Sequence, residues 1–165
     1  MSGAKAWSSV IGVRFIQISL VYFIIGAIWM GLGPTPLLPS PSQALASEVY
    51  DTARVHVMVL GWASFALIGV LYYLVPKMRG KEEIHSRKLA SVHFWITNIA
   101  LPLGIVVTTY VSFVIDSLLS SGVAEATVFV TPPASTFLTT FLLLFIIGLI
   151  AQLTFVYNIY KTLGS

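Results

Sequence analysis

The chain has 165 residues, of which 57% are hydrophobic and only 9% are charged, and its mean hydropathy is +0.92. Soluble globular domains carry roughly 25% charged residues, so this composition excludes a disordered chain, a nucleic-acid-binding module and an ordinary water-soluble enzyme. The formal net charge is +3 and there is no cysteine, which excludes disulfides, thiolate metal sites and iron–sulfur clusters.

Four apolar stretches are long enough to cross a lipid bilayer, which takes roughly 20 residues in helical form. They cover residues 15–33, 54–76, 89–115 and 134–160. None alternates with period two, and backbone groups in lipid must be satisfied within a helix or a closed barrel. The sequence therefore predicts an all-α, multi-pass protein of the cell membrane. We expect a single four-helix bundle over residues 1–165.

The positions of the basic residues predict the orientation of the bundle. If both termini are cytoplasmic, that side carries eight of the nine basic residues, namely Lys5, Arg14, Lys77, Arg79, Lys81, Arg87, Lys88 and Lys161. Only Arg54 lies on the outer side. This asymmetry follows the positive-inside rule, so the basic surplus indicates topology and not a nucleic-acid partner.

The histidines are the strongest candidates for chemistry, because no carboxylate falls in the middle of an apolar stretch. His56 lies near the outer end of the second predicted helix, and His93 lies near the inner end of the third. At 1.5 Å per residue their depths differ by roughly 20 Å, so these two residues of one chain cannot bind the same haem iron. His85 falls in the polar loop between the two helices.

The surroundings of His56 suit a flat ligand. On a regular helix, residues 56, 59, 63, 66 and 70 share one face, which reads His, Val, Ala, Ala, Val. A haem could lie on this smooth strip, over Ala63, with His56 as its axial ligand; close helix packing is the alternative. Arg54 could bind a haem propionate, or it could simply contact Asp51 one turn earlier.

The stretch from Arg54 to Pro76, RVHVMVLGWASFALIGVLYYLVP, resembles the second helix of subunit I of the haem–copper oxidases, most closely the nitric oxide reductase branch. In that family an Arg and a haem-ligating His open the helix, and Tyr-Tyr-Leu-Val-Pro closes it. The resemblance implies that His56 is an axial ligand of a low-spin haem b near the outer face. Subunit I of this family contains many more helices, and no histidine follows His93 here, so the ligand set of a dinuclear oxygen- or nitric-oxide-reducing centre is missing.

Several groups could complete the iron site. A second copy could supply its own His56, Met30 at a similar depth could bind, a partner subunit could donate a ligand, or the iron could stay five-coordinate and bind a diatomic gas. His93 could ligate a second haem near the inner face, hydrogen-bond a quinone carbonyl, or simply be hydrogen-bonded to the backbone or to a loop residue at the interface.

We therefore expect a b-type cytochrome in a homodimer, a larger homo-oligomer or a respiratory complex. It would carry electrons from a quinol or bind a gas. A structural subunit without haem is one alternative, and a small carrier for a neutral solute is another.

Overall fold

The computed structural model describes residues 7–33 and 35–164; Lys5, which was used above to predict the orientation, lies outside them. All the long elements are helices. Their bounds are α1 Trp7–Leu32, α2 Ala44–His56, η1 Val57–Ser64, α3 Phe65–Met78, α4 Arg87–Ser120, α5 Glu125–Val128 and α6 Ala134–Gly164. Elements α2, η1 and α3 follow one another without a break. They form one rod, which we call the second span, and its central part η1 is a π-helix.

Four helices are long and apolar enough to cross a membrane: Val10–Leu32, the second span Ala44–Met78, Arg87–Ser120 and Ala134–Gly164. This finding confirms the predicted four-helix membrane fold. In each helix no more than a third of the most apolar segment is buried inside the bundle. Most apolar side chains therefore face outward, as expected for a protein whose surroundings are lipid or other membrane helices.

The second span begins about one turn after the proline-rich loop, at Ala44, and not at residue 54 as the hydropathy indicated. Its first turns are polar and carry Glu48 and Asp51. A carboxylate from α4 supports this start: Asp116 Oδ1 accepts hydrogen bonds from the backbone N–H groups of Ser42 and Gln43, both at 2.7 Å. These donors lie at the beginning of a helix, where backbone N–H groups lack partners within the helix, so a side chain distant in sequence provides the cap.

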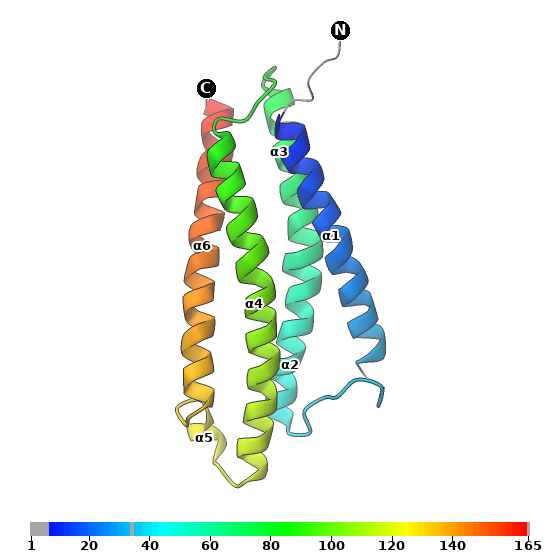
Figure 1. Cartoon of the computed structure of the whole chain (residues 1–165), viewed down its shortest axis with the longest axis vertical. Coiled ribbons are helices and arrows are strands. Elements are labelled where there is room, and N and C mark those ends of the chain that lie inside the picture. Colours follow the sequence, from blue (N-terminus) through cyan, green and yellow to red (C-terminus); the bar gives the residue numbers. More distant parts are fainter. Residues whose placement is uncertain (1–6, 34, 165) are drawn as a thin grey trace.

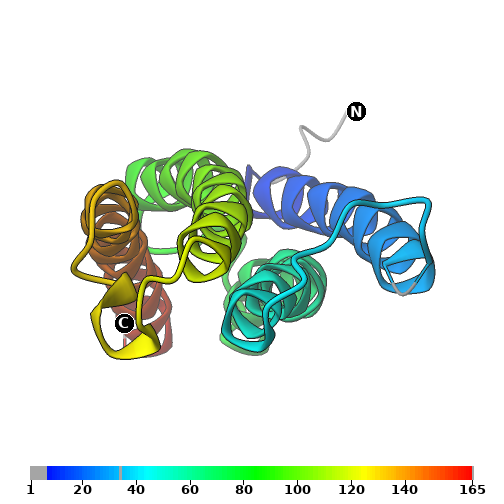
Figure 2. The same ribbon diagram turned by 90° about the horizontal axis from the view of Figure 1, so that it is seen from below.

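The helices form an open arc in which α4 packs on α6 and on the second span, and α1 packs on the other side of the second span (Figures 1 and 2). Helices α6 and α1 therefore lie on opposite sides of the bundle. The start of α1, the end of α6 and the loop between α3 and α4 share one end, as the predicted topology requires (Figure 1). Which side of the membrane that end faces stays a prediction.

Glycines allow α1 to approach the second span closely. A Cβ atom added to Gly69 would lie 2.6 Å from the carbonyl oxygen of Gly12, and one added to Gly12 would lie 2.7 Å from the carbonyl oxygen of Gly69. Farther along, a Cβ on Gly61 would lie within 2.5 Å of the Tyr22 side chain. Small residues at such crossings let membrane helices gain close van der Waals contact.

At the end of the bundle where α1 starts and α6 ends, hydrogen bonds join the α3–α4 loop to α6. Asn158 accepts from the backbone N–H of Ser86 at 2.8 Å and donates to the carbonyl oxygen of Ser86 at 2.9 Å. The Thr162 hydroxyl accepts from the backbone N–H of His85 at 2.9 Å. Ser86 in turn caps α4 by accepting from the backbone N–H of Leu89. These contacts fix α6 against the start of α4, next to His93.

Candidate functional site

An apolar groove of about 370 Å³ lies between the second span, α4 and α6. The second span contributes Ala53, His56, Leu60, Ser64, Phe65 and Ile68; α4 contributes Thr97, Ala100, Leu101, Gly104, Ile105 and Thr108; and α6 contributes Phe141, Leu144, Phe145, Gly148, Leu149 and Gln152. From Thr97 to Thr108 the α4 wall covers eleven residue steps, or about 16 Å. His56 marks one end of the groove, and Thr97 and Gln152 mark the other.

His56 is oriented by its own helix. Its Nδ1 lies 2.7 Å from the carbonyl oxygen of Thr52, and because a carbonyl can only accept, Nδ1 carries the proton and donates. The other ring nitrogen, Nε2, then has its lone pair free when the ring is neutral. A hydrogen bond from the other ring nitrogen to a carbonyl oxygen commonly fixes the ring of a metal-ligating histidine. The half-buried side chain of His56 lines the groove.

The groove does not use the face expected from a regular helix. The groove is lined by three residues that follow His56 along the span, Leu60, Ser64 and Ile68. The expected face is exposed outside the groove at Val59, Ala63 and Val70. The π-helical segment η1 shifts the register between His56 and the rest of the span. The smooth strip through Ala63 is therefore not the surface that the groove presents.

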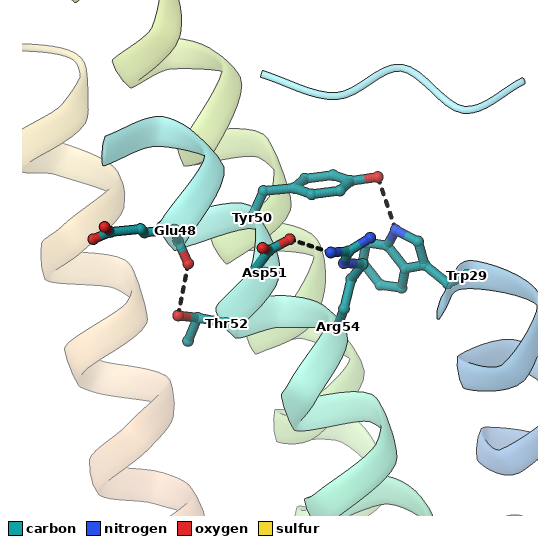
Figure 3. Close-up of polar contacts among 6 residues, drawn as sticks. All are labelled: Trp29, Glu48, Tyr50, Asp51, Thr52 and Arg54. Carbon is teal, nitrogen blue, oxygen red and sulfur yellow. Dashed lines mark hydrogen bonds and ion pairs between the residues drawn. The ribbon is translucent and has the colours of Figure 1, made fainter. Parts of the chain in front are cut away.

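Arg54 lies on the side of the second span that faces α1 (Figure 3). Its guanidinium pairs with the Asp51 carboxylate and lies 5.6 Å from the centre of the Tyr50 ring. Tyr50 is only 5% exposed, and its hydroxyl accepts a 2.7 Å hydrogen bond from Trp29 Nε1. The contact with Asp51, one of the two alternatives for Arg54, is present, and the guanidinium is held in a cluster beside α1.

Met30 is 47% exposed on α1 and does not line the groove. Helix α1 packs against the second span through the glycines described above. Met30 and the groove are therefore on different sides of the fold, and the structure does not bring Met30 together with His56.

His93 is completely buried where all four long helices meet. Its ring stacks between Phe15 of α1 and Phe155 of α6, with both ring centres 5.1 Å away. The Tyr72 hydroxyl of α3 and His93 Nδ1 share a hydrogen bond of 3.0 Å. Gln152 approaches the ring, but within the described part of the chain Nε2 has no hydrogen bond of good geometry. His93 is thus enclosed by aromatic rings, with Tyr72 of α3 as a hydrogen-bond partner; its role as a haem ligand stays a prediction.

The two histidines are far apart. Tyr72, which contacts His93, lies sixteen residues after His56 along the second span, which corresponds to roughly 20 Å. His85 is exposed in the α3–α4 loop at the His93 end. In residues 7–33 and 35–164 no three His, Asp or Glu side chains gather as a metal-binding group.

The groove residues fit one face of a haem. The walls are apolar, one histidine offers a free ring nitrogen, and a Cβ added at Gly104 or Gly148 would meet no atom within 4 Å. The space beside these two glycines is open. No second nitrogen or sulfur ligand from the described residues lines the groove, so among these side chains His56 is the one that could hold a haem iron.

The sequence left several groove residues unidentified. Gly104, Gly148 and Gln152 belong to α4 and α6, and nothing in their own stretches indicates a ligand. The spacing of small residues along α4, such as Ala100, Gly104 and Thr108, was the available signal, but small residues at helical spacing equally indicate close packing.

The sequence profile of the family described as "Cytochrome C and Quinol oxidase polypeptide I" matches residues 10–165. The Cbb3-type cytochrome c oxidase subunit CcoN1 of Stutzerimonas stutzeri is 32% identical over 91 residues, which are 55% of this chain and 19% of that protein. Cytochrome c oxidase subunit 1 of Rhodobacter capsulatus is 37% identical over 54 residues, 33% of this chain and 10% of that protein.

A cytochrome c oxidase subunit 1 homolog of Agrobacterium tumefaciens is 37% identical over 65 residues, 39% of this chain and 11% of that protein. The matched parts thus cover less than a fifth of the length of each of these relatives. No solved structure matches the chain significantly.

Proposed function

Because the chain belongs to the family of cytochrome c and quinol oxidase polypeptide I, whose members bind haems in the membrane, we propose that it binds haem b through His56. The observation that carries this proposal is the His56 ring itself. Its Nδ1 donates to Thr52, its Nε2 is left as a possible ligand, and the ring lies at the end of an apolar groove. A haem held there would supply one-electron redox chemistry or a binding site for a diatomic gas.

The groove residues would bind and shield the macrocycle. Phe65 and Ile68 of the second span and Phe145 of α6 line the groove with apolar surface, which would keep water from a bound haem and influence its reduction potential. The hydroxyls in the groove are already satisfied: Ser64, Thr97 and Thr108 each donate to a backbone carbonyl of their own helix. Without free donors in its middle, the groove favours an apolar ring.

The second axial ligand comes from outside this set of side chains in our proposal. A second copy related by a two-fold axis along the membrane normal presents its His56 at the same depth, so two copies could share one haem. Another respiratory subunit is the alternative source. We propose electron transfer from a quinol as the role, with gas binding as the variant if the iron is five-coordinate.

A structural subunit without haem is the second candidate function. The outward-facing apolar surface of all four spans favours it, because such surface suits packing against other membrane helices as well as lipid. This candidate predicts a colourless protein that co-purifies with larger respiratory subunits.

The test is a reduced-minus-oxidised absorbance spectrum of the purified chain, made in haem-sufficient cells, with haem counted per chain. We expect a b-type band that disappears in His56→Ala. His85→Ala, which removes an exposed loop histidine, serves as the matched control and keeps the band. A colourless parent protein, or full haem content in His56→Ala, contradicts the proposal. One haem per two chains indicates a shared haem.

A further inference from the structure

The second span changes its helix type directly after His56. Residues Val57–Ser64 form a π-helix, with α-helix before and after them. The Ser64 hydroxyl donates to the carbonyl oxygen of Val59, five residues earlier, at 2.8 Å. Such segments are rare, and they are found inside α-helices most often at functional sites. This one separates the candidate ligand His56 from α3, whose Tyr72 contacts His93.

The helix type decides where His56 points. In an α-helix each residue turns by 100°, so His56 and Ile68, twelve residues apart, would lie about 120° apart around the axis. A π-helix takes roughly 4.4 residues per turn, which reduces each of eight steps to about 82°. The two residues then lie within about 30° of each other, which agrees with both of them lining the groove.

The same change of helix type keeps the opposite face in register. Gly61 meets Tyr22 and Gly69 meets Gly12, so both glycines face α1. In an uninterrupted α-helix these two glycines would be about 80° apart. With the π-helical steps between residues 61 and 65 they are nearly aligned. One segment therefore adjusts both the groove face and the α1 face of the span.

We propose that η1 is a positioning element that accommodates one extra residue in the second span and so turns His56 into the groove. This inference deepens the haem-binding role and rests on it for its function, whereas the geometry can be tested without haem. An α-helical span that is one residue shorter would place His56 about 20° from Ile68, so it would keep the histidine in the groove.

The proposal predicts that deletion and insertion have unequal effects. Deleting Val59, which is 52% exposed and outside the groove, lets η1 become α-helical and keeps His56 in place. Inserting one alanine after Val59 adds a residue that η1 does not accommodate, and it turns His56 by about 100°. A span without such an element would misplace His56 by about 100° in both variants.

The absence of cysteine in the chain allows a haem-free measurement. Spin labels at His56→Cys and Phe145→Cys report the distance across the groove by pulsed electron paramagnetic resonance in nanodiscs. A 100° turn on a helix with a side-chain radius of about 5 Å moves the label by about 8 Å. We expect the parent distance in the Val59 deletion, a shift of about 8 Å in the insertion, and no change in Val59→Ala, which keeps the chain length.

In chains that retain His56, the deletion should keep the haem content of the parent and the insertion should lose it. Equal label shifts in the two variants overturn the inference, and so does a deletion variant that fails to fold. An insertion variant that fails to fold beside a folded deletion variant shows the expected asymmetry. If the labels behave as expected but no chain binds haem, the register argument stands and the haem proposal fails.

Discussion

Replacing Tyr72 by phenylalanine tests the structural role of His93. The Tyr72 hydroxyl and His93 Nδ1 share a hydrogen bond of 3.0 Å, and both side chains are fully buried. Removing the hydroxyl leaves Nδ1 without this partner in a site closed by Phe15 and Phe155. Hydrogen bonds inside membrane bundles contribute about 0.6 kcal/mol on average, and an orphaned buried donor or acceptor costs about 1–3 kcal/mol. We therefore expect Tyr72→Phe to lower the free energy of unfolding by about 1–2 kcal/mol.

The double variant Tyr72→Phe/His93→Phe distinguishes a lost pair from lost packing. It replaces both partners by apolar rings of similar shape, a change that can be nearly neutral. The two single changes should therefore not add, and the coupling energy should be about 1 kcal/mol. Unfolding by sodium dodecyl sulfate in mixed micelles, followed by tryptophan fluorescence, measures all four proteins of the cycle.

Haem content adds a functional readout to the same variants. His93 lies roughly 20 Å from His56 along the bundle, so His93→Phe should leave the haem content per chain unchanged. Additive effects of the single changes on stability refute the hydrogen-bond argument. A fall in haem content in His93→Phe refutes the assignment of His93 to packing and restores it as a ligand.

Three further predictions concern the groove and its supports. Gly104→Leu should fill the groove, where an added Cβ meets nothing within 4 Å, and should lower the haem content while the stability of the fold is kept. Gly31→Leu, at an open position on α1, is the control. Equal haem loss in both variants would contradict the groove assignment. Gly69→Val should separate α1 from α3 and destabilise the fold by about 1–3 kcal/mol, measured as a lower midpoint of thermal unfolding; an unchanged midpoint contradicts the close crossing. Asp116→Ala should remove the cap of α2 and cost about 1 kcal/mol, measured by the same unfolding assay, and a neutral effect would show that the cap is dispensable.

The membrane fold could be predicted from composition and hydropathy, because a span needs only enough consecutive apolar residues to cover the bilayer. All four spans follow from this requirement. The first turns of the second span were missed for the same reason, because they carry Glu48 and Asp51 and so do not belong to a continuous apolar stretch. Asp116 of α4 supports the start of this helix by accepting hydrogen bonds from the backbone N–H groups of Ser42 and Gln43, directly before Ala44, and such a contact across 73 residues leaves no local pattern.

The candidate ligand was also accessible from sequence, since the stretch from Arg54 to Pro76 carries a recognisable family pattern around His56. Its face was not. The expected strip through Val59 and Ala63 assumes regular α-helical turns, and η1 breaks that regularity. Arg54, placed by sequence near a possible propionate, is directed to Asp51 and Tyr50 beside α1 (Figure 3).

The sequence by itself determined the four membrane helices, because a span depends on residue type and local order along the chain. For the same reason it supplied His56 as a candidate ligand and a predicted sidedness. The tertiary structure decided which histidine lines the groove and which is enclosed by rings. Burial and direction depend on helix register and on partners from other helices. His93 is closed off by Phe15, Tyr72 and Phe155, which come from three different elements, and only their packing brings them together.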